Sequence, residues 1–318
     1  MIPDDDARPF HSSLRPLHRC FGCCGGRLAL PGRRLFGGAL LGAGAALALP
    51  GWAREGVDVG GTSIFTKAVS ADQIEQAAAQ QYVQLQQQAI QQRALAPADH
   101  PQEVRLRSIA ERIIPFSYDW NPRARQWRWE VNLIGSRQIN AFCMPGGKIA
   151  FYYGILDQLK LDDDEVAMVM GHEMAHALRE HAREQMGKTM ATRGVVEIGS
   201  ALLGLGNAGR YAAGLSGQLL TLRFGRADES EADLVGMELA ARAGYDPRSG
   251  VTLWKKMAAA NKGAPPQWLS THPAGATRIH DIEANLPKVE PLYERAPKPA
   301  QQFGPPQTRP RAPSEQRD

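Results

Sequence analysis

The sequence predicts an α+β fold that is mostly helical and carries one small β-sheet. Several long segments, such as the glutamine- and alanine-rich residues 71–93, have the composition and periodicity of helices. By contrast, apolar and polar side chains alternate between Trp127 and Leu133, the pattern of a half-buried strand. The strand-like segments are short and adjacent in the chain, so we expect them to form a single sheet within a helical domain.

The other elements are expected in the following order. A second helix at residues 101–113 precedes the first strand. Two more strands, near 138–143 and 148–153, are separated by a Pro-Gly-Gly turn. Two helices that carry the motifs described below come next, followed by helices near 248–261 and 274–285.

The helix that follows the strands has a strong start signal. Asp162 stands three residues before Glu165, which is the spacing of a capping box. A continuous apolar run from Val166 to Met170 follows, and a helix that is apolar on every side is typically buried. Polar side chains further along this helix therefore need a specific reason to be there.

Such side chains are present as an HExxH motif. His172 and His176 are four residues apart, so their imidazoles share one face of the helix and can bind one zinc ion. Glu173 stands beside them and can take a proton from a water molecule. The motif also occurs by chance on exposed helices, but burial favours a metal site here.

A third metal ligand is needed, and His181 is the nearest candidate. A metzincin would have glycine at position 179 and histidine at 182, where this chain has Arg179 and Ala182. His181 would also lie about half a turn around the helix from His172. We therefore expect His181 to be an exposed polar residue rather than a ligand.

A second candidate lies about fifty residues downstream. Glu229 and Asp233 form another i, i+4 pair, on a helix expected to end near Gly244. Glu229 can supply the third ligand, and Asp233 can accept the free N–H of a zinc-bound imidazole. The alternative, a solvated acidic cluster, fits less well with an HExxH motif in the same chain.

Together these motifs resemble the M48 zinc metallopeptidases, gluzincins related to the Ste24 and Oma1 proteases. The resemblance covers roughly residues 68–286 and is greatest to the short, soluble, exported bacterial members. It rests on HExxH and ExxxD, on the glutamine-rich first helix, and on two shorter segments: Asn140-Ala141-Phe142 with its Pro-Gly-Gly turn, and Thr271-His272-Pro273 with Arg278.

The resemblance implies a gluzincin-type domain with one zinc ion per chain, held by His172, His176 and Glu229. It implies a zinc endopeptidase that hydrolyses unfolded or misassembled cell-envelope proteins, with Glu173 as the base. The alternative is a chaperone or assembly factor that uses the same cleft, with cleavage secondary. Asp233 would then be an outer partner of the metal ligands.

The resemblance also suggests roles for residues outside the metal ligands. The strand of Asn140, Ala141, Phe142 and Cys143 is expected to pair with the substrate backbone by strand addition. His272 could stabilise the oxyanion, occupy the open zinc position as a latch, or cap a turn. Arg278 is expected to support His272 or to pair with a carboxylate.

The first 53 residues are expected to be an export signal. Arg33 and Arg34 precede a glycine-, alanine- and leucine-rich run that ends at Leu49, which indicates a Tat-like signal rather than a Sec signal. We expect the mature protein in the periplasm or cell envelope, where it could also associate with the membrane surface. The alternative is an uncleaved anchor in the inner membrane.

The rest of the chain is divided into a peptidase domain at 54–290 and a disordered tail at 291–318, with loss of order expected from Pro287 on because proline, glutamine and charge dominate there. The apolar, glycine-rich stretch 194–222 is read either as a gate beside the active site or as a pair of core helices. Cys143 is the only cysteine after the signal and is expected to be buried on a strand.

Charge gives no argument for a nucleic-acid partner. The formal net charge is +4, but residues 1–53 contain six arginines and three aspartates and so carry +3 of it. The domain that follows is nearly neutral, unlike proteins that bind the phosphate backbone through a basic surface.

Overall fold

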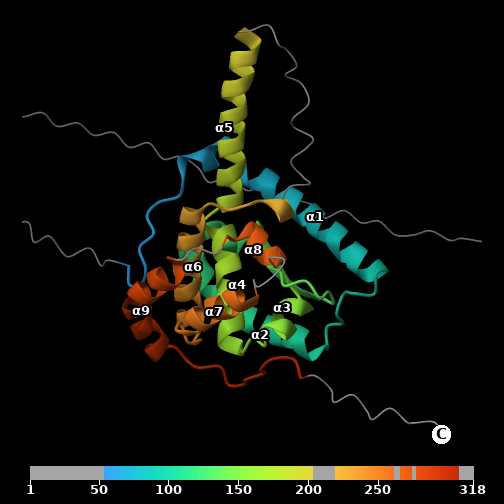
Figure 1. The fold of residues 1–318 in the computed structure, drawn as a ribbon, viewed down its shortest axis with the longest axis vertical. Coiled ribbons are helices and arrows are strands. Elements are labelled where there is room, and N and C mark those ends of the chain that lie inside the picture. Colours follow the sequence, from blue (N-terminus) through green and yellow to red (C-terminus); the bar gives the residue numbers. More distant parts are fainter. Residues whose placement is uncertain (1–53, 203–218, 261–265, 274–276, 308–318) are drawn as a thin grey trace, which may run out of the picture. The chain divides into compact units, whose positions relative to one another are not determined.

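The computed structural model describes residues 54–202, 219–260, 266–273 and 277–307. The expected export signal and residues 203–218 of the apolar stretch lie outside the described residues. Within them the fold is mostly helical with one small sheet, so the predicted fold class is confirmed (Figure 1).

The helices and strands occur close to the predicted positions. They are, in chain order, η1 (Ile64–Ala68), α1 (Ala71–Gln91), α2 (Pro101–Ile113), η2 (Ile114–Asp119), η3 (Pro122–Arg125), β1 (Glu130–Ile134), β2 (Ala141–Met144), β3 (Lys148–Tyr152), α3 (Tyr153–Gln158), α4 (Asp163–Leu178), α5 (His181–Leu202), η5 (Leu219–Thr221), α6 (Arg226–Arg242), α7 (Ser249–Ala260), α8 (Gln267–Thr271) and α9 (Arg278–Arg295).

The sheet has the strand order β1-β3-β2, with β1 parallel and β2 antiparallel to β3. The first strand begins later than predicted, because the backbone pairing with β3 starts only at Glu130; before it, the indole N–H groups of Trp127 and Trp129 bond to Glu75 and to the Ala124 carbonyl. Cys143 is buried on β2, as expected. Among the described strands β2 pairs with β3 alone, so its other edge is free.

Helix α4 is the buried centre of the domain. The predicted capping box is present, since the Glu165 N–H bonds to Asp162 and the Asp162 N–H bonds to Glu165. Helix α6 crosses α4 at two glycines: a Cβ on Gly171 would lie 2.5 Å from the Gly236 carbonyl oxygen, and a Cβ on Gly236 would lie 2.5 Å from the His172 nitrogen. No larger residue could replace either glycine without moving a backbone, and this close approach brings the two motif helices together.

Helix α4 ends earlier than the sequence indicates. Glu180 has a left-handed backbone with φ 61° and separates α4 from α5, which begins at His181. A non-glycine residue in this region is uncommon, and no glycine marks the break in the sequence. His181 is the first residue of α5, which extends beyond the other helices in Figure 1, and so it is not on the same helix as the HExxH motif.

The chain beyond Pro287 is ordered as far as the described residues go, so the expectation of disorder there is wrong up to residue 307. Helix α9 continues through Pro287 and Pro291 because Ile282, Val289 and Leu292 on one face are buried in the core. The following segment lies against the domain, where Asp163 accepts hydrogen bonds from two backbone N–H groups. Residues 308–318 lie outside the described part.

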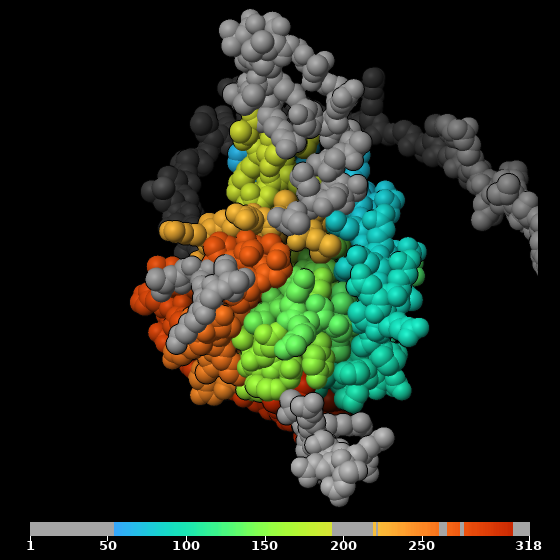
Figure 2. Space-filling view, turned by 45° about the vertical axis from the view of Figure 1, so that its right-hand side comes forward, coloured from blue at the N-terminus to red at the C-terminus, as the bar shows by residue number. Residues whose placement is uncertain are grey.

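Residues that are distant in the sequence form neighbouring surfaces of the domain. In the space-filling view α1, in cyan, lies on one side of the green segment around the sheet, and the orange residues after 225 lie on the other (Figure 2). Among the helices of the described residues, none combines the length and apolar character needed to cross a membrane.

Candidate metal centre

The two histidines of the HExxH motif point to one place, as their spacing predicts. The Nε2 atoms of His172 and His176 are 3.1 Å apart, and both side chains are buried. Their rings come from consecutive turns of α4, the helix whose capped start and apolar run place it in the core.

Helix α6 brings a carboxylate to the same place. Glu229 Oε2 lies 3.6 Å from His172 Nε2, and Glu229 Oε1 lies 3.5 Å from His176 Nε2. Glu229 and Asp233 are 1% and 4% exposed, so this pair is not a solvated acidic cluster. Glu229 stands about two helical turns before Gly236, and the glycine contact between α4 and α6 therefore sets its distance from the histidines.

A fourth side chain approaches from α8 and the turn that follows it. His272 Nδ1 lies 3.0 Å from Glu229 Oε1 and 3.4 Å from His172 Nε2. One donor atom from each of His172, His176, Glu229 and His272 lies within 4.8 Å of the others. Three imidazoles and one carboxylate that converge in a buried space fit the donor set and number that a transition-metal ion prefers.

Glu173 lies next to this cluster. Its Oε1 atom accepts a hydrogen bond from the indole Nε1 of Trp268 at 2.6 Å and lies 3.6 Å from His272 Nε2. Sequence reasoning placed Glu173 beside the metal but did not identify Trp268, because nothing in the spacing of the two residues links them.

An ionic network lies behind His172. Its Nδ1 atom is 3.1 Å from Asp233 Oδ1, as expected for an outer partner of a metal ligand. Arg278 donates to both oxygens of Asp233 at 2.6 and 2.7 Å and to Glu229 Oε2 at 2.6 Å. Of the two roles predicted for Arg278, the structure therefore favours pairing with carboxylates, and it pairs with two at once.

This network keeps both carboxylates ionised. Burial alone would raise the pKa of Asp233, but the charge of Arg278 and the hydrogen bond to His172 lower it to about 2. Burial likewise opposes ionisation of Glu229, and the hydrogen bond and charge of His272 lower its pKa in spite of that. Two negative groups are thus available at the centre, even deep in the core.

The predicted exposure of His181 is wrong. It is 1% exposed, and its Nδ1 atom lies 2.9 Å from Nδ1 of His176. The helix break at Glu180 is the physical reason, because it turns the first residue of α5 back toward the end of α4. For His176 Nε2 to face a metal with a free lone pair, Nδ1 must carry the proton and donate it to His181.

The pKa values of two of the histidines are shifted in opposite directions. Burial, followed by the nearby histidines and Arg278, lowers the pKa of His176 well below 6.5 and keeps it neutral. For His272 burial has the same direction, but the charge of Glu173 and the hydrogen bond to Glu229 raise its pKa overall. A neutral His176 is the form that can bind a metal.

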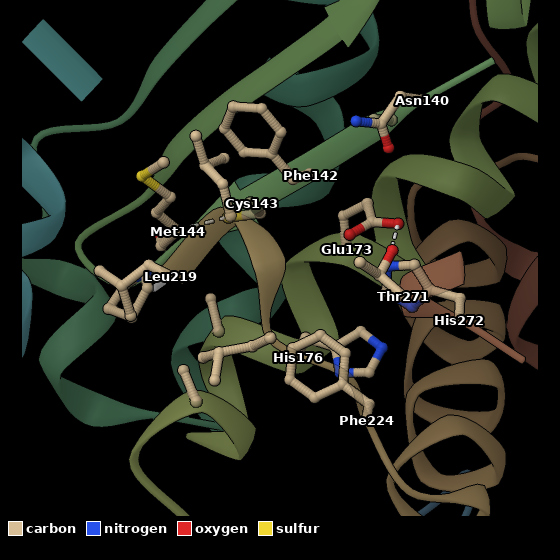
Figure 3. Close-up of a pocket in the computed structure, with 16 residues that line it drawn as sticks. Asn140, Phe142, Cys143, Met144, Glu173, His176, Leu219, Phe224, Thr271 and His272 are labelled. Atoms are coloured by element: carbon tan, nitrogen blue, oxygen red, sulfur yellow. Dashed lines mark hydrogen bonds and ion pairs between the residues drawn. The ribbon is translucent and has the colours of Figure 1, made fainter. Parts of the chain in front are cut away.

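A pocket opens beside the cluster, between it and strand β2. Asn140, Phe142, Cys143 and Met144 lie along one side of the pocket, and Glu173, His176 and His272 lie opposite them (Figure 3). Leu219, Leu220 and Leu222 also line it, so the described end of the 194–222 stretch reaches the site. This observation leaves both readings of that stretch, gate and core, as predictions.

The free edge of β2 has backbone groups available in this pocket. The Tyr152 N–H bonds to the Asn140 carbonyl at 3.0 Å, which establishes which residues of the strand face β3. Bonding alternates along an antiparallel pair, so the N–H and carbonyl groups of Ala141 and Cys143 are directed to the free edge.

Comparisons with known proteins agree with this geometry. The chain is 34% identical over 198 residues to the mitochondrial metalloendopeptidase OMA1 of Schizosaccharomyces pombe, a match covering 62% of this chain and 56% of that protein. It is 39% identical over 152 residues to OMA1 of Arabidopsis thaliana, covering 47% of this chain and 30% of that protein. It is 29% identical over 170 residues to the beta-barrel assembly-enhancing protease of Escherichia coli, covering 50% of this chain and 35% of that protein.

The chain thus spans less than two thirds of the length of each of these relatives. The sequence model of Peptidase family M48 matches residues 100–286, which is more than half of the chain. The matched region contains every residue of the metal centre and its backing network, from Glu173 and the histidines to Arg278. The chain belongs to peptidase family M48.

Proposed function

We propose that this protein is a zinc-dependent endopeptidase that hydrolyses peptide bonds of unfolded or misassembled cell-envelope proteins. One observation carries the proposal: His172, His176 and Glu229 converge in a buried site, with Glu173 beside them and the free edge of β2 across the pocket. Imidazole and carboxylate ligands with one further position are typical of catalytic zinc.

Each side chain has a role in this proposal. A zinc ion held by His172, His176 and Glu229 would polarise the scissile carbonyl and acidify a water molecule. Glu173 takes a proton from the attacking water and then delivers it to the leaving amine nitrogen. Asp233 and Arg278 hold the His172 ring and the Glu229 carboxylate in place.

The substrate would bind as an added strand. The N–H and carbonyl groups of Ala141 and Cys143 can pair with an extended peptide, as sheet edges do in other peptide-binding proteins. Backbone pairing selects for extended chains more than for particular side chains, which suits unfolded clients. The name of the Escherichia coli relative, which refers to β-barrel assembly, supports envelope proteins as those clients.

We place the protein in the periplasm or cell envelope, after export by the Tat-like signal, with association to the membrane surface possible there. Retention by an uncleaved N-terminus in the inner membrane is the alternative. Replacing both Arg33 and Arg34 by lysine should trap the precursor inside the cell. Normal processing of that double variant would instead indicate Sec export.

The test of the activity is the variant Glu173→Gln. It leaves the proposed zinc ligands intact, so we expect wild-type zinc content and thermal stability, with cleavage of unfolded casein lower by orders of magnitude. Cleavage at the wild-type rate would show that Glu173 is not the base. Normal cleavage by protein stripped of zinc would exclude a metallopeptidase.

An assembly-factor role is the second candidate, and the word "assembly-enhancing" in a relative's name favours it. The same Glu173→Gln variant separates the two functions in cells that lack the wild-type protein. If it restores envelope-protein assembly as well as the wild type does, binding is the main function and cleavage is secondary. Failure of this variant, with stable client complexes, would favour proteolysis.

We further propose that His272 is a latch on the fourth zinc position. Its position supports this role, because Nδ1 lies beside Glu229 and His172 rather than out in the pocket. His272→Ala should then raise basal proteolysis while zinc content stays near normal. A fall in kcat of roughly 100-fold or more would instead assign His272 to the oxyanion, and an unchanged rate would leave only a turn-capping role.

A further inference from the structure

We propose that Trp268 is a positioning residue for the general base, and that its indole N–H holds the Glu173 carboxylate in the orientation needed for proton transfer. This inference rests on the proposed peptidase function and extends it to a residue outside both zinc-binding motifs. It assigns a specific hydrogen bond to the tryptophan three residues before Thr271, the first residue of the Thr-His-Pro segment.

The hydrogen bond between the side chains of Trp268 and Glu173 is short and buried. The indole Nε1 of Trp268 donates to Glu173 Oε1 at 2.6 Å, and the two residues are only 1% and 2% exposed. A hydrogen bond to an ionised carboxylate is about twice as strong as one between neutral groups, and exclusion of water strengthens it further. Glu173 therefore does not rotate freely within the pocket.

The indole is itself held from several directions. The Trp268 backbone N–H bonds to the Ile139 carbonyl at 3.1 Å, which ties α8 to the segment leading into β2. Its ring stacks on His272 at a centroid distance of 4.9 Å and packs against Trp254 at 5.3 Å. The donor thus has a fixed position relative to both the metal centre and the substrate strand.

In this arrangement the two carboxylate oxygens of Glu173 have different roles. Oε1 faces Trp268 and His272, whereas Oε2 accepts no hydrogen bond from the described residues. In the proposed step, one O–H bond of the attacking water breaks and its proton moves to Oε2, while the water oxygen bonds to the scissile carbonyl carbon and the indole bond to Oε1 persists. The proton then leaves Oε2 for the amine nitrogen as the C–N bond breaks, and Glu173 returns to its starting state.

The site also links the base to the proposed latch. The His272 backbone N–H donates to the Trp268 carbonyl at 2.8 Å, so one turn of chain carries both residues. A displacement of this turn would move the donor of Glu173 together with His272. Trp268 therefore connects the orientation of the base to the position of His272.

The kinetic test uses Trp268→Phe, which keeps an aromatic ring in the core and removes only the N–H donor and part of the indole. We expect kcat to fall about 10- to 100-fold, the range for losing one hydrogen bond to a charged group, with KM and zinc content close to wild type. The matched control is Trp127→Phe, because Trp127 also donates its indole N–H to a glutamate, Glu75, outside the site. A kcat of Trp268→Phe within twofold of this control would overturn the proposal.

A second measurement does not depend on activity or on the stability of the variant. The chain has six tryptophans, and ¹⁵N labelling gives each indole N–H its own NMR signal. In zinc-loaded Glu173→Gln we expect one indole proton to move upfield, because a neutral amide is a weaker acceptor than a carboxylate. The signal that moves should be the one missing from Trp268→Phe.

The two measurements separate failure of this inference from failure of the proposed function. If no indole signal responds to Glu173→Gln, the hydrogen bond is absent and the inference is wrong, whatever the protein cleaves. If the signal responds but wild-type protein cleaves no peptide, the hydrogen bond is present and the proposed peptidase function is wrong. If the signal responds and Trp268→Phe keeps full kcat, the positioning role is wrong.

Discussion

The two histidines of the metal centre differ in what lies behind their rings. His172 is backed by a full negative charge, since Asp233 faces its Nδ1 and is itself held by two bonds from Arg278. His176 is backed by another imidazole, that of His181. The partners of His181 are more distant: Glu231 Oε2 lies 3.6 Å from its Nε2, and Glu231 is paired in turn with Arg179.

This difference has a chemical consequence. A carboxylate behind a ligating imidazole fixes its tautomer and also raises its basicity, whereas a neutral acceptor fixes the tautomer with less effect on basicity. We therefore infer that the His172 side contributes more to metal affinity and to stability than the His176 side. The predictions below test this inequality, beginning with the largest expected effect.

The largest effect should be a loss of stability when the arginine behind each histidine is removed: Arg278 behind His172, and Arg179 behind His176. Arg278→Met leaves two buried carboxylates without their partner, so we expect the free energy of unfolding of the metal-free protein to fall by about 3–5 kcal/mol. Arg179→Met should cost less, on the order of 1–2 kcal/mol, because Glu231 remains partly solvated. Denaturant unfolding measures both, and equal losses would contradict the inequality.

Metal affinity should respond strongly on the His172 side. Asp233→Ala removes the acceptor of the ligand's N–H, so we expect zinc to bind roughly 10- to 100-fold more weakly. Competition with a chelator of known affinity measures this loss. Asp246→Ala is a suitable control, since Asp246 is an aspartate whose side chain bonds to Arg248 on the surface. A change of less than threefold in Asp233→Ala would show that this carboxylate is structural only.

The two sides should also lose stability in different pH ranges. The folded pKa of Asp233, about 2, lies below its usual 3.8, so its contribution is complete above 3.8 and is lost as the pH falls toward 2. This contribution is about 2 kcal/mol. The pKa of His176 lies well below 6.5, so protons bind first to the unfolded chain and stability falls as the pH drops below 6.5.

Difference curves for metal-free protein isolate each contribution. Wild type minus Asp233→Asn should decline only between about pH 4 and pH 2, whereas wild type minus His176→Gln should decline from about pH 6.5 downward. Identical pH profiles for the two difference curves would show that the sides do not titrate separately.

The smallest effect is expected at His181. His181→Leu removes the acceptor for His176 but keeps an apolar side chain in a buried site, so we expect zinc affinity to fall less than about 10-fold. His181→Gln, which retains an acceptor oxygen, should recover part of the loss. A loss in His181→Leu as large as that in Asp233→Ala would reverse the inequality, and wild-type affinity would restore the bystander role expected from the sequence.

The same two sides show how far the sequence could be read. Asp233 was predictable because it stands one helical turn after Glu229, and local spacing determines which side chains share a helix face. His181 was misjudged because the break at Glu180 carries no glycine, so the spacing was extended along a helix that ends at Leu178. Likewise, Pro287 and Pro291 predicted disorder where the buried face of α9 keeps the helix intact.

By itself, the sequence determined the local features of the two motif helices. These are the capped start of α4, the shared face of His172 and His176, and the i, i+4 spacing of Glu229 and Asp233. These features depend on helix geometry over a few residues, which holds before any tertiary contact forms. Only the tertiary structure decided how the helices meet. The glycine crossing of α4 and α6, the pairing of Arg278 with Asp233 and Glu229, and the bond from Trp268 to Glu173 join residues 45 to 95 positions apart. Contacts at such separations depend on packing that no local pattern encodes.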